Sequence, residues 1–308
     1  MKNYLSYYYD INADNIHHVG NEYQFELDSY EYRFFEYNDD PMKVNEIYNF
    51  SLEIMGRGIY CHQIILNKEK KIITYLNGKP HILMKCYKNL NQKVDINDLA
   101  LFGNLYINDS KQAHSNWKKM WEQKMDYLEY QISQFGNKHF LLRNSFNYFS
   151  GFVETGIQLL NEIDFTNNNL VLSHKRIKEN YTQFDLYNPF NFIVDFKVRD
   201  FCEYIKDKIV LKKNTTDLIE IKQLILLYLN NNNLSKTDIQ LFFVRLLYPS
   251  FYFDVFEELI VSTVEDHDNN QLKNILSSVD DYEKIVIDIY NYLFESNYLP
   301  LIEWLKFV

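Results

Sequence analysis

Up to about residue 88, most apolar residues of this chain follow a strand-like spacing, with one helical repeat among them. From Asn89 onward, most follow a helical spacing. Side chains of a strand alternate between two faces, whereas the apolar face of a helix recurs every three or four residues. The change in spacing predicts an α+β protein with two lobes, residues 1–88 and 89–308. Because 46% of the 308 residues are hydrophobic, such a chain can bury a sizeable core.

The N-terminal lobe is expected to be a five-stranded sheet with one helix. Alternating residues within Glu22–Tyr37 predict a hairpin. Pro41 then opens a helical repeat that Gly56 closes. Three further strand-like runs follow this helix, namely Tyr60–Leu66, Lys71–Leu76 and His81–Tyr87.

The C-terminal lobe is expected to be mostly helical. Trp117 and Trp121 share one helical face with Met125, which we interpret as a core stripe, with an aromatic ligand box as the alternative. Ser235 followed by Asp238 predicts the start of a later helix, because a carboxylate at that spacing can accept from an exposed backbone N–H group. Two strand-like runs interrupt the helices, namely Leu170–Ser173 and Phe192–Phe196.

Charge and cysteine content argue against several classes of function. The formal net charge of −10 repels a phosphate backbone, so nucleic acid is not expected as a partner. The three cysteines stand apart, without the spacing of a zinc site or a disulfide framework, which is typical of reduced thiols. Neither a secretory signal nor an apolar stretch of membrane-spanning length is visible. We therefore expect a cytoplasmic protein that does not span a membrane.

Four patches of sequence carry a more specific signal: Trp117–Glu129, Tyr148–Gln158, Leu172–Arg176 continued by Phe192–Ile205, and Phe243–Phe253. Together, and in this order, they resemble the spore-coat-associated kinase-like proteins of the CotS/YutH type. These proteins belong with the choline and aminoglycoside phosphotransferases. The resemblance implies a protein-kinase-like fold, with a small antiparallel β-rich N-lobe and a large, mostly helical C-lobe.

The resemblance also implies where the groups of phosphoryl transfer would lie. Catalysis of this kind needs a lysine on the phosphates, a carboxylate near the attacking hydroxyl and ligands for magnesium. The lysine would lie on the N-terminal hairpin, but no lysine occurs between Lys2 and Lys43. The matching positions hold Arg33 or Glu36, so the phosphate clamp is expected to be missing.

The catalytic loop is degenerate in the same comparison. His174, Lys175 and Arg176 stand where active relatives carry His-Gly-Asp, and Arg176 falls at the place of the catalytic aspartate. A guanidinium cannot accept a proton at neutral pH. We therefore assign no catalytic residue and interpret His174 as a hydrogen-bonded packing residue.

Candidates for a metal site and for structural support come from the resemblance alone. Asp195 matches the metal-binding aspartate of active relatives, and Asn180 lies close to the place of their magnesium-binding asparagine. Asp200 resembles the aspartate that supports the catalytic loop, and Arg199 beside it is expected to form an ion pair. For Asp195, turn hydrogen bonds are the alternative role.

Three functional hypotheses remain open. The first is a pseudokinase, a non-catalytic interaction or structural protein associated with the spore coat, with protein partners and no cofactor. The second is an active small-molecule phosphotransferase with relocated groups, which would use ATP and magnesium with Asp195 as metal ligand and Asp185 or Glu179 as base. The third is an unrelated helical scaffold. No small-molecule ligand can be named from the sequence.

Overall fold

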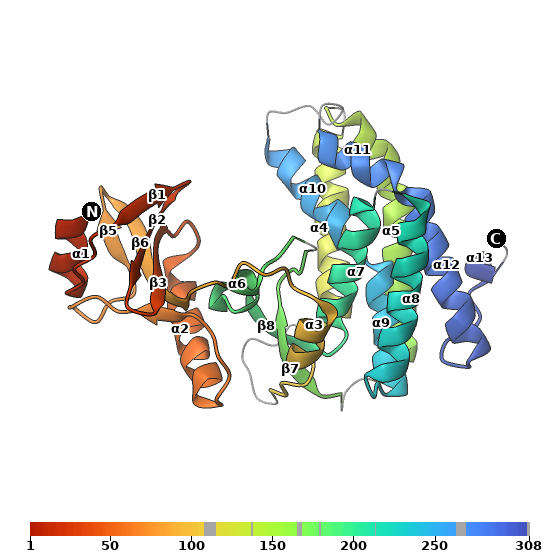
Figure 1. Cartoon of the computed structure of the whole chain (residues 1–308). Coiled ribbons are helices and arrows are strands. Elements are labelled where there is room, and N and C mark those ends of the chain that lie inside the picture. The colour runs from red at the N-terminus through yellow and green to blue at the C-terminus, as the bar shows by residue number, and fades with distance from the viewer. Residues whose placement is uncertain are drawn as a thin grey trace. The chain divides into compact units, whose positions relative to one another are not determined.

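The computed structural model describes residues 1–107, 115–136, 138–164, 168–178, 180–212, 214–262 and 269–306 (Figure 1). The chain divides into two compact units by its contacts. Unit 1 comprises Met1–Val94 and Asn180–Phe192, and unit 2 comprises Asp95–Glu179 and Ile193–Val308. The segment 180–192, which the sequence-based division left in the C-terminal lobe, thus packs with the N-terminal residues.

Unit 1 is built on a six-stranded antiparallel sheet in the order β1-β2-β3-β6-β4, with β5 beside β6. The sequence predicted five strands and one helix; β1 and α1 are additional. The histidine-containing β1 is only four residues long, too short for its alternation to be recognised. The elements are α1 (Lys2–Tyr9), β1 (Ile16–Val19), β2 (Glu22–Leu27), β3 (Tyr30–Glu36), α2 (Pro41–Gly56), β4 (Gln63–Ile65), β5 (Thr74–Leu76) and β6 (Lys79–Tyr87).

The two faces of this sheet pack against different helices. Successive side chains of a strand point to opposite faces, so Phe34 and Phe35 of β3 enter different cores. Phe34 packs with Leu5 of α1, and Phe35 packs in the cluster that contains Val44 of α2. Asp40 fixes the start of α2 by accepting a 2.9 Å hydrogen bond from the backbone N–H of Met42.

Residues 180–192 lie on the α2 side of the sheet. They form the short helix α6 (Gln183–Leu186) and the 3₁₀ turn η1 (Pro189–Asn191). Backbone hydrogen bonds attach them to the stretch after β6, where Gln183 donates to Gln92 over 2.9 Å and Val94 donates to Tyr181 over 2.9 Å. The ring of Phe190 then contacts Phe35, with the ring centroids 5.7 Å apart.

Unit 2 is mostly helical and contains one two-stranded sheet, β7-β8 (Figure 1). The predicted start of a helix at Ser235 is confirmed, because Ser235 and Asp238 form reciprocal side-chain-to-backbone hydrogen bonds of 3.0 Å. The elements are α3 (Ile96–Phe102), α4 (Trp117–Phe135), α5 (Phe140–Glu162), β7 (Leu170–His174), β8 (Phe192–Phe196), α7 (Arg199–Leu211), α8 (Thr215–Asn231), α9 (Lys236–Leu247), α10 (Ser250–Val261), α11 (Asn270–Ser277), α12 (Val279–Glu295) and α13 (Glu303–Lys306).

One apolar stretch corrects an expectation from the sequence. Among the described residues, Lys236–Val261 is long and apolar enough to cross a membrane by length and composition, with a mean hydropathy of 1.2. It forms the two helices α9 and α10, which Tyr248 and Pro249 separate, and 83% of its apolar 18-residue window is buried within the protein. Its apolar character is thus accounted for by packing in the core of unit 2.

Candidate functional site

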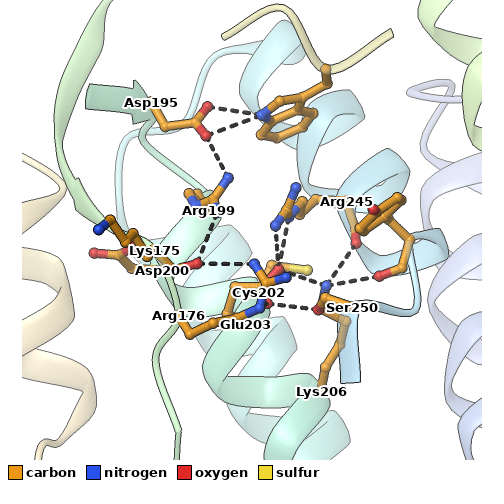
Figure 2. Close-up of polar contacts among 12 residues, drawn as sticks. Lys175, Arg176, Asp195, Arg199, Asp200, Cys202, Glu203, Lys206, Arg245 and Ser250 are labelled. Atoms are coloured by element: carbon orange, nitrogen blue, oxygen red, sulfur yellow. Dashed lines mark hydrogen bonds and ion pairs between the residues drawn. The ribbon is translucent and has the colours of Figure 1, made fainter. Parts of the chain in front are cut away.

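The residues that match a catalytic loop and its supports gather at the ends of β7 and β8 and in the first turn of α7. His174 ends β7. Asp195 lies near the end of β8, and Arg199 and Asp200 open α7 (Figure 2). The apolar residues of both strands bury these ends in unit 2. The charged side chains therefore meet in an environment with little water.

His174 and Asp200 form a close buried pair. Asp200 accepts one hydrogen bond from the backbone N–H of His174 over 2.9 Å, and its other oxygen lies 2.6 Å from His174 Nδ1. The side chain of His174 is fully buried. Asp200 therefore fixes both the backbone and the ring orientation at the end of β7, which is a structural task.

Arg199 connects the loop after β7 to β8. It was expected to pair with its neighbour Asp200, but its guanidinium lies on Asp195, with Nη1 2.6 Å from Oδ2. Neighbouring residues on a helix point about 100° apart, so Arg199 and Asp200 face different partners. The remaining N–H groups of Arg199 donate to the carbonyl oxygens of His174 and Lys175, over 3.0 and 2.9 Å.

Asp195 is completely buried, and both of its carboxylate oxygens accept hydrogen bonds. Its Oδ1 accepts from the backbone N–H of Phe196 over 2.7 Å and from Trp117 Nε1 over 2.9 Å. Its Oδ2 accepts from Arg199 over 2.6 Å and lies 3.1 Å from the same indole nitrogen. Burial raises the pKa of Asp195 above its ordinary value, against the opposing effect of Arg199.

These contacts test whether Asp195 fits a magnesium ion. A carboxylate offers about four lone-pair positions, and here protein donors occupy both oxygens. A magnesium ion prefers several oxygen ligands and would have to displace the guanidinium of Arg199. In the parts of the chain that the structure describes, no group of three or more His, Cys, Asp or Glu residues could hold a metal. The residues around Asp195 therefore do not fit this ion.

The second metal candidate lies in the other unit. Asn180 is an exposed residue of unit 1, whereas Asp195 belongs to unit 2. The alternative base Asp185 is also in unit 1, where its Oδ2 accepts from the backbone N–H and the hydroxyl of Thr182, both over 2.9 Å. It thereby caps α6. Glu179 lies outside the described residues.

Arg176, which the sequence resemblance aligns with a catalytic aspartate, forms a two-pronged ion pair. Its Nε and Nη2 each lie 2.8 Å from one carboxylate oxygen of Asp254 on α10. Burial by itself would lower the pKa of Arg176, but Asp254 and Glu203 raise it above the ordinary value. At this place the loop therefore carries a permanently charged guanidinium, which is already bound to Asp254 on α10.

A second charge cluster, which the sequence analysis did not identify, is centred on the buried carboxylate of Glu203 (Figure 2). Its Oε1 lies 2.8 and 2.7 Å from Nε and Nη2 of Arg245 and 2.7 Å from Nζ of Lys206, and its Oε2 accepts from Ser250 over 2.7 Å. Burial alone would raise the pKa of Glu203, but Arg245 and Lys206 hold this pKa well below its ordinary value. Burial lowers the pKa of Lys206 to about 8.

This cluster had a signal in the sequence. Arg245 stands alone between the apolar runs Leu241–Val244 and Leu246–Leu247 in the second half of α9. An isolated charge in a buried stretch needs a partner of opposite sign. The partner, Glu203, is 42 residues away in the sequence, so only the fold identifies it.

The tryptophans on α4 surround a side chain of the protein itself. The guanidinium carbon of Arg245 lies 5.2 Å from the ring of Trp117, 5.9 Å from that of Trp121 and 5.3 Å from that of Tyr248. Trp121 stacks on Tyr248 with their centroids 4.4 Å apart. Both tryptophans are buried, as a core stripe requires, and the aromatic box already holds a cation.

In unit 1, the positions that match the phosphate-binding lysine are engaged within the unit. Glu36 is paired with Lys79 over 2.8 Å. Arg33 lies 2.6 Å from Glu31 and 3.4 Å from Glu22, and its guanidinium carbon lies 3.5 Å from the ring centre of Phe184. Neither side chain offers an uncommitted ammonium to a phosphate.

Solved structures with the same fold are kinases of small molecules. An aminoglycoside phosphotransferase from Alicyclobacillus acidocaldarius matches with a TM-score of 0.61 and 8% identity, over 93% of this chain and 94% of that one. A spectinomycin phosphotransferase, solved with ADP and spectinomycin, gives 0.54 and 14%, over 97% and 98%. An amicoumacin kinase gives 0.51 and 11%, over 89% and 88%. At such identities the likeness shows the fold alone, and it confirms the kinase-like fold predicted from the sequence.

Sequence comparison identifies a family. Residues 2–289 match the family described as "Spore coat putative kinase YutH". This match covers nearly the whole chain and confirms the resemblance found in the four patches of sequence. No curated protein sequence matches the chain.

Proposed function

Since the chain belongs to the spore coat putative kinase YutH family, we propose that it is a pseudokinase that acts through protein partners in association with the spore coat. The observation that carries this proposal is the state of Asp195. Trp117, Phe196 and Arg199 engage both oxygens of its carboxylate, so it is unsuited to hold the magnesium ion that phosphoryl transfer needs.

Two further features support the absence of catalysis. Arg176 replaces the carboxylate that would accept the proton of an attacking hydroxyl, and its ion pair with Asp254 fixes it in place. Arg33 and Glu36 replace the phosphate-binding lysine, and each is paired with a neighbouring side chain. The three groups that phosphoryl transfer depends on are therefore replaced or engaged elsewhere.

The positions of the buried charged side chains support a structural role. Buried ion pairs join α7 to β8 and to α9, and Arg199 donates hydrogen bonds to the backbone carbonyls of His174 and Lys175, so these contacts brace unit 2. A rigid kinase-like fold can serve as a binding platform. The family description supports a place at the spore coat, to which a protein made in the cytoplasm would be recruited.

The test is a calorimetric titration of the full-length protein with ATP, with and without magnesium, together with a thermal-shift measurement. We expect no magnesium-dependent stabilisation at millimolar nucleotide and no transfer of phosphate to a panel of hydroxylated small molecules. Asp195→Asn serves as the site control, and Asp126→Asn on an exposed position of α4 serves as the matched carboxylate control.

The active phosphotransferase is the competing function, and the same titration decides between them. Magnesium-dependent stabilisation that disappears in Asp195→Asn and survives in Asp126→Asn would replace the pseudokinase with an enzyme. In that case Asp185→Asn would test the relocated base, although this carboxylate caps α6.

A further inference from the structure

The segment 180–192 covers Arg33 on the α2 side of the unit 1 sheet. Arg33 is the only lysine or arginine between residues 3 and 42, so it is the one cation that this hairpin could offer to an anionic ligand. Its side chain is only 18% exposed. Its guanidinium carbon lies over the ring of Phe184, 3.5 Å from the ring centre, and Glu31 and Glu22 pair with its N–H groups.

His62 anchors the same part of the segment. Its backbone N–H donates to the carbonyl oxygen of Tyr187 over 3.0 Å, and its Nε2 lies 2.9 Å from the carbonyl oxygen of Phe184. A carbonyl only accepts, so Nε2 carries the hydrogen, and Nδ1 can accept from the hydroxyl of Tyr60 3.1 Å away. Burial lowers the pKa of His62 to about 4, which keeps the ring in this neutral form at physiological pH.

A second aromatic anchor lies at the other end of the segment. The ring of Phe190 contacts Phe35 and Tyr37, with centroids 5.7 and 5.8 Å away. The segment is held together by its own hydrogen bonds, such as Asn191 Nδ2 to the carbonyl oxygen of Asp185 over 2.9 Å. It is therefore an ordered piece that can dock or detach as one body.

We propose that residues 180–192 form a docked strap that closes the Arg33 face of unit 1 to nucleoside triphosphates, with Phe184 and Phe190 as its two anchors. This inference rests on the proposed function and deepens it, because it names the segment that covers the Arg33 face of unit 1. A triphosphate would need to displace the Phe184 ring and compete with two carboxylates before it reached Arg33. Residues 180–192 thus occupy the face where a triphosphate would otherwise bind.

The experiment uses the full-length protein and the double variant F184A/F190A, with Phe140→Ala on an exposed position of α5 as the matched control. Amide exchange at Gln183 and Phe184 reports docking, since these N–H groups donate to Gln92 and Leu90. Calorimetry with ATP reports binding. We expect at least tenfold faster exchange and at least tenfold tighter ATP binding in the double variant, and loss of that binding when Arg33→Ala is added.

Each other outcome counts against the strap. Wild-type protein that binds ATP as well as the double variant would show that the face is open. Fast amide exchange in the double variant without tighter ATP binding would show that the strap does not block a nucleotide site. Unchanged amide exchange would show that the rings of Phe184 and Phe190 do not anchor the strap. If the double variant fails to fold, Phe184→Leu, which keeps apolar bulk but removes the ring over Arg33, is measured in the same way.

The outcomes also separate the strap from the proposed function. ATP binding by the wild type that is independent of magnesium and gives no transfer would overturn the strap and leave the pseudokinase standing. Phosphate transfer by the double variant would overturn the pseudokinase and leave the strap standing.

Discussion

Arg176 holds Asp254 in a two-pronged ion pair, with one N–H group 2.8 Å from each carboxylate oxygen. This contact joins the degenerate loop after β7 to α10. An aspartate at position 176 would face the carboxylates of Asp254 and Glu203, whose repulsion would oppose it there. The arginine and the acidic residues that surround it therefore form one structural unit.

We predict that this pair contributes a measurable coupling energy. A double-mutant cycle with Arg176→Ala and Asp254→Ala should give about 1 kcal/mol, because the geometry favours two hydrogen bonds while both side chains remain about one-third exposed. Denaturant unfolding of the four proteins measures it. The control pair is Lys118 and Glu122 on α4, which lie 3.9 Å apart and are more exposed, and should couple by less than about 0.5 kcal/mol. Equal coupling in the two cycles would remove the special role of Arg176.

Replacement of Glu203 by glutamine should be much more costly. It leaves Arg245 and Lys206 buried without their counter-charge, and such a loss costs about 3–5 kcal/mol. Urea unfolding at pH 7 measures the loss of free energy. Glu258→Gln on an exposed position of α10 should change it by less than about 0.5 kcal/mol. Comparable losses in both variants would mean that the cluster does not hold unit 2 together.

The same variant should respond differently to acid. The pKa of Glu203 in the folded protein lies well below the ordinary 4.5, so the unfolded chain binds a proton first as the pH falls. The stability contributed by Glu203 is therefore present above pH 4.5 and is lost as the pH drops towards the folded pKa. We expect the free energy of unfolding of Glu203→Gln to fall less steeply below pH 4.5 than that of the wild type. Parallel curves would contradict this.

Two glycines of α5 should respond in opposite directions to alanine. A Cβ atom on Gly156 would lie 3.3 Å from Cζ3 of Trp121, and Trp121 is held between Trp117 and Tyr248, so it cannot move aside. Gly156→Ala should destabilise the protein by about 1 kcal/mol. A Cβ atom on Gly151 meets no atom within 4 Å, so Gly151→Ala should stabilise it by about 0.5–1 kcal/mol through helix propensity. Thermal unfolding compares them, and a stabilising Gly156→Ala would show that the tryptophans are loosely packed.

A feature of this structure can be predicted from the sequence when the residues that form it lie close together along the chain. The hairpin that contains β2 and β3 and the cap at Ser235 depend on residues a few positions apart, and the spacing reveals them. The family resemblance adds the expected places of the catalytic groups because patches of residue types match those of the family. Local signals therefore predict the fold class and the position of the degenerate loop.

Partners far apart in the sequence could not be predicted. Arg199 was expected to pair with the adjacent Asp200, yet the direction of each side chain on α7 assigns it to Asp195. Glu203 meets Arg245 across 42 residues, and Phe184 reaches Arg33 across the whole of β4 to β7. Such pairs depend on how helices and strands pack, and no pattern of residues along the chain encodes them.

His62 should make the stability of unit 1 depend on pH in a range where Glu203 does not change its protonation. Its pKa is lowered from 6.5 to about 4 by burial in the folded protein, with Arg33 adding to the effect and Asp185 opposing it. Between these values the unfolded chain binds a proton that the folded chain does not, so stability is lost as the pH falls from 6.5 towards 4. A shift of this size corresponds to roughly 3 kcal/mol at most.

The measurement is denaturant unfolding followed by fluorescence between pH 7 and pH 5, above the range of Glu203. We expect the wild type and His17→Gln, whose histidine on β1 is exposed, to lose stability in parallel as the pH falls. His62→Gln should start lower at pH 7 but show a flatter curve, because glutamine can still donate to the Phe184 carbonyl oxygen and has no proton to gain. If His62→Gln follows the slope of the wild type, another group causes the pH dependence and the strap is not fixed by a neutral imidazole.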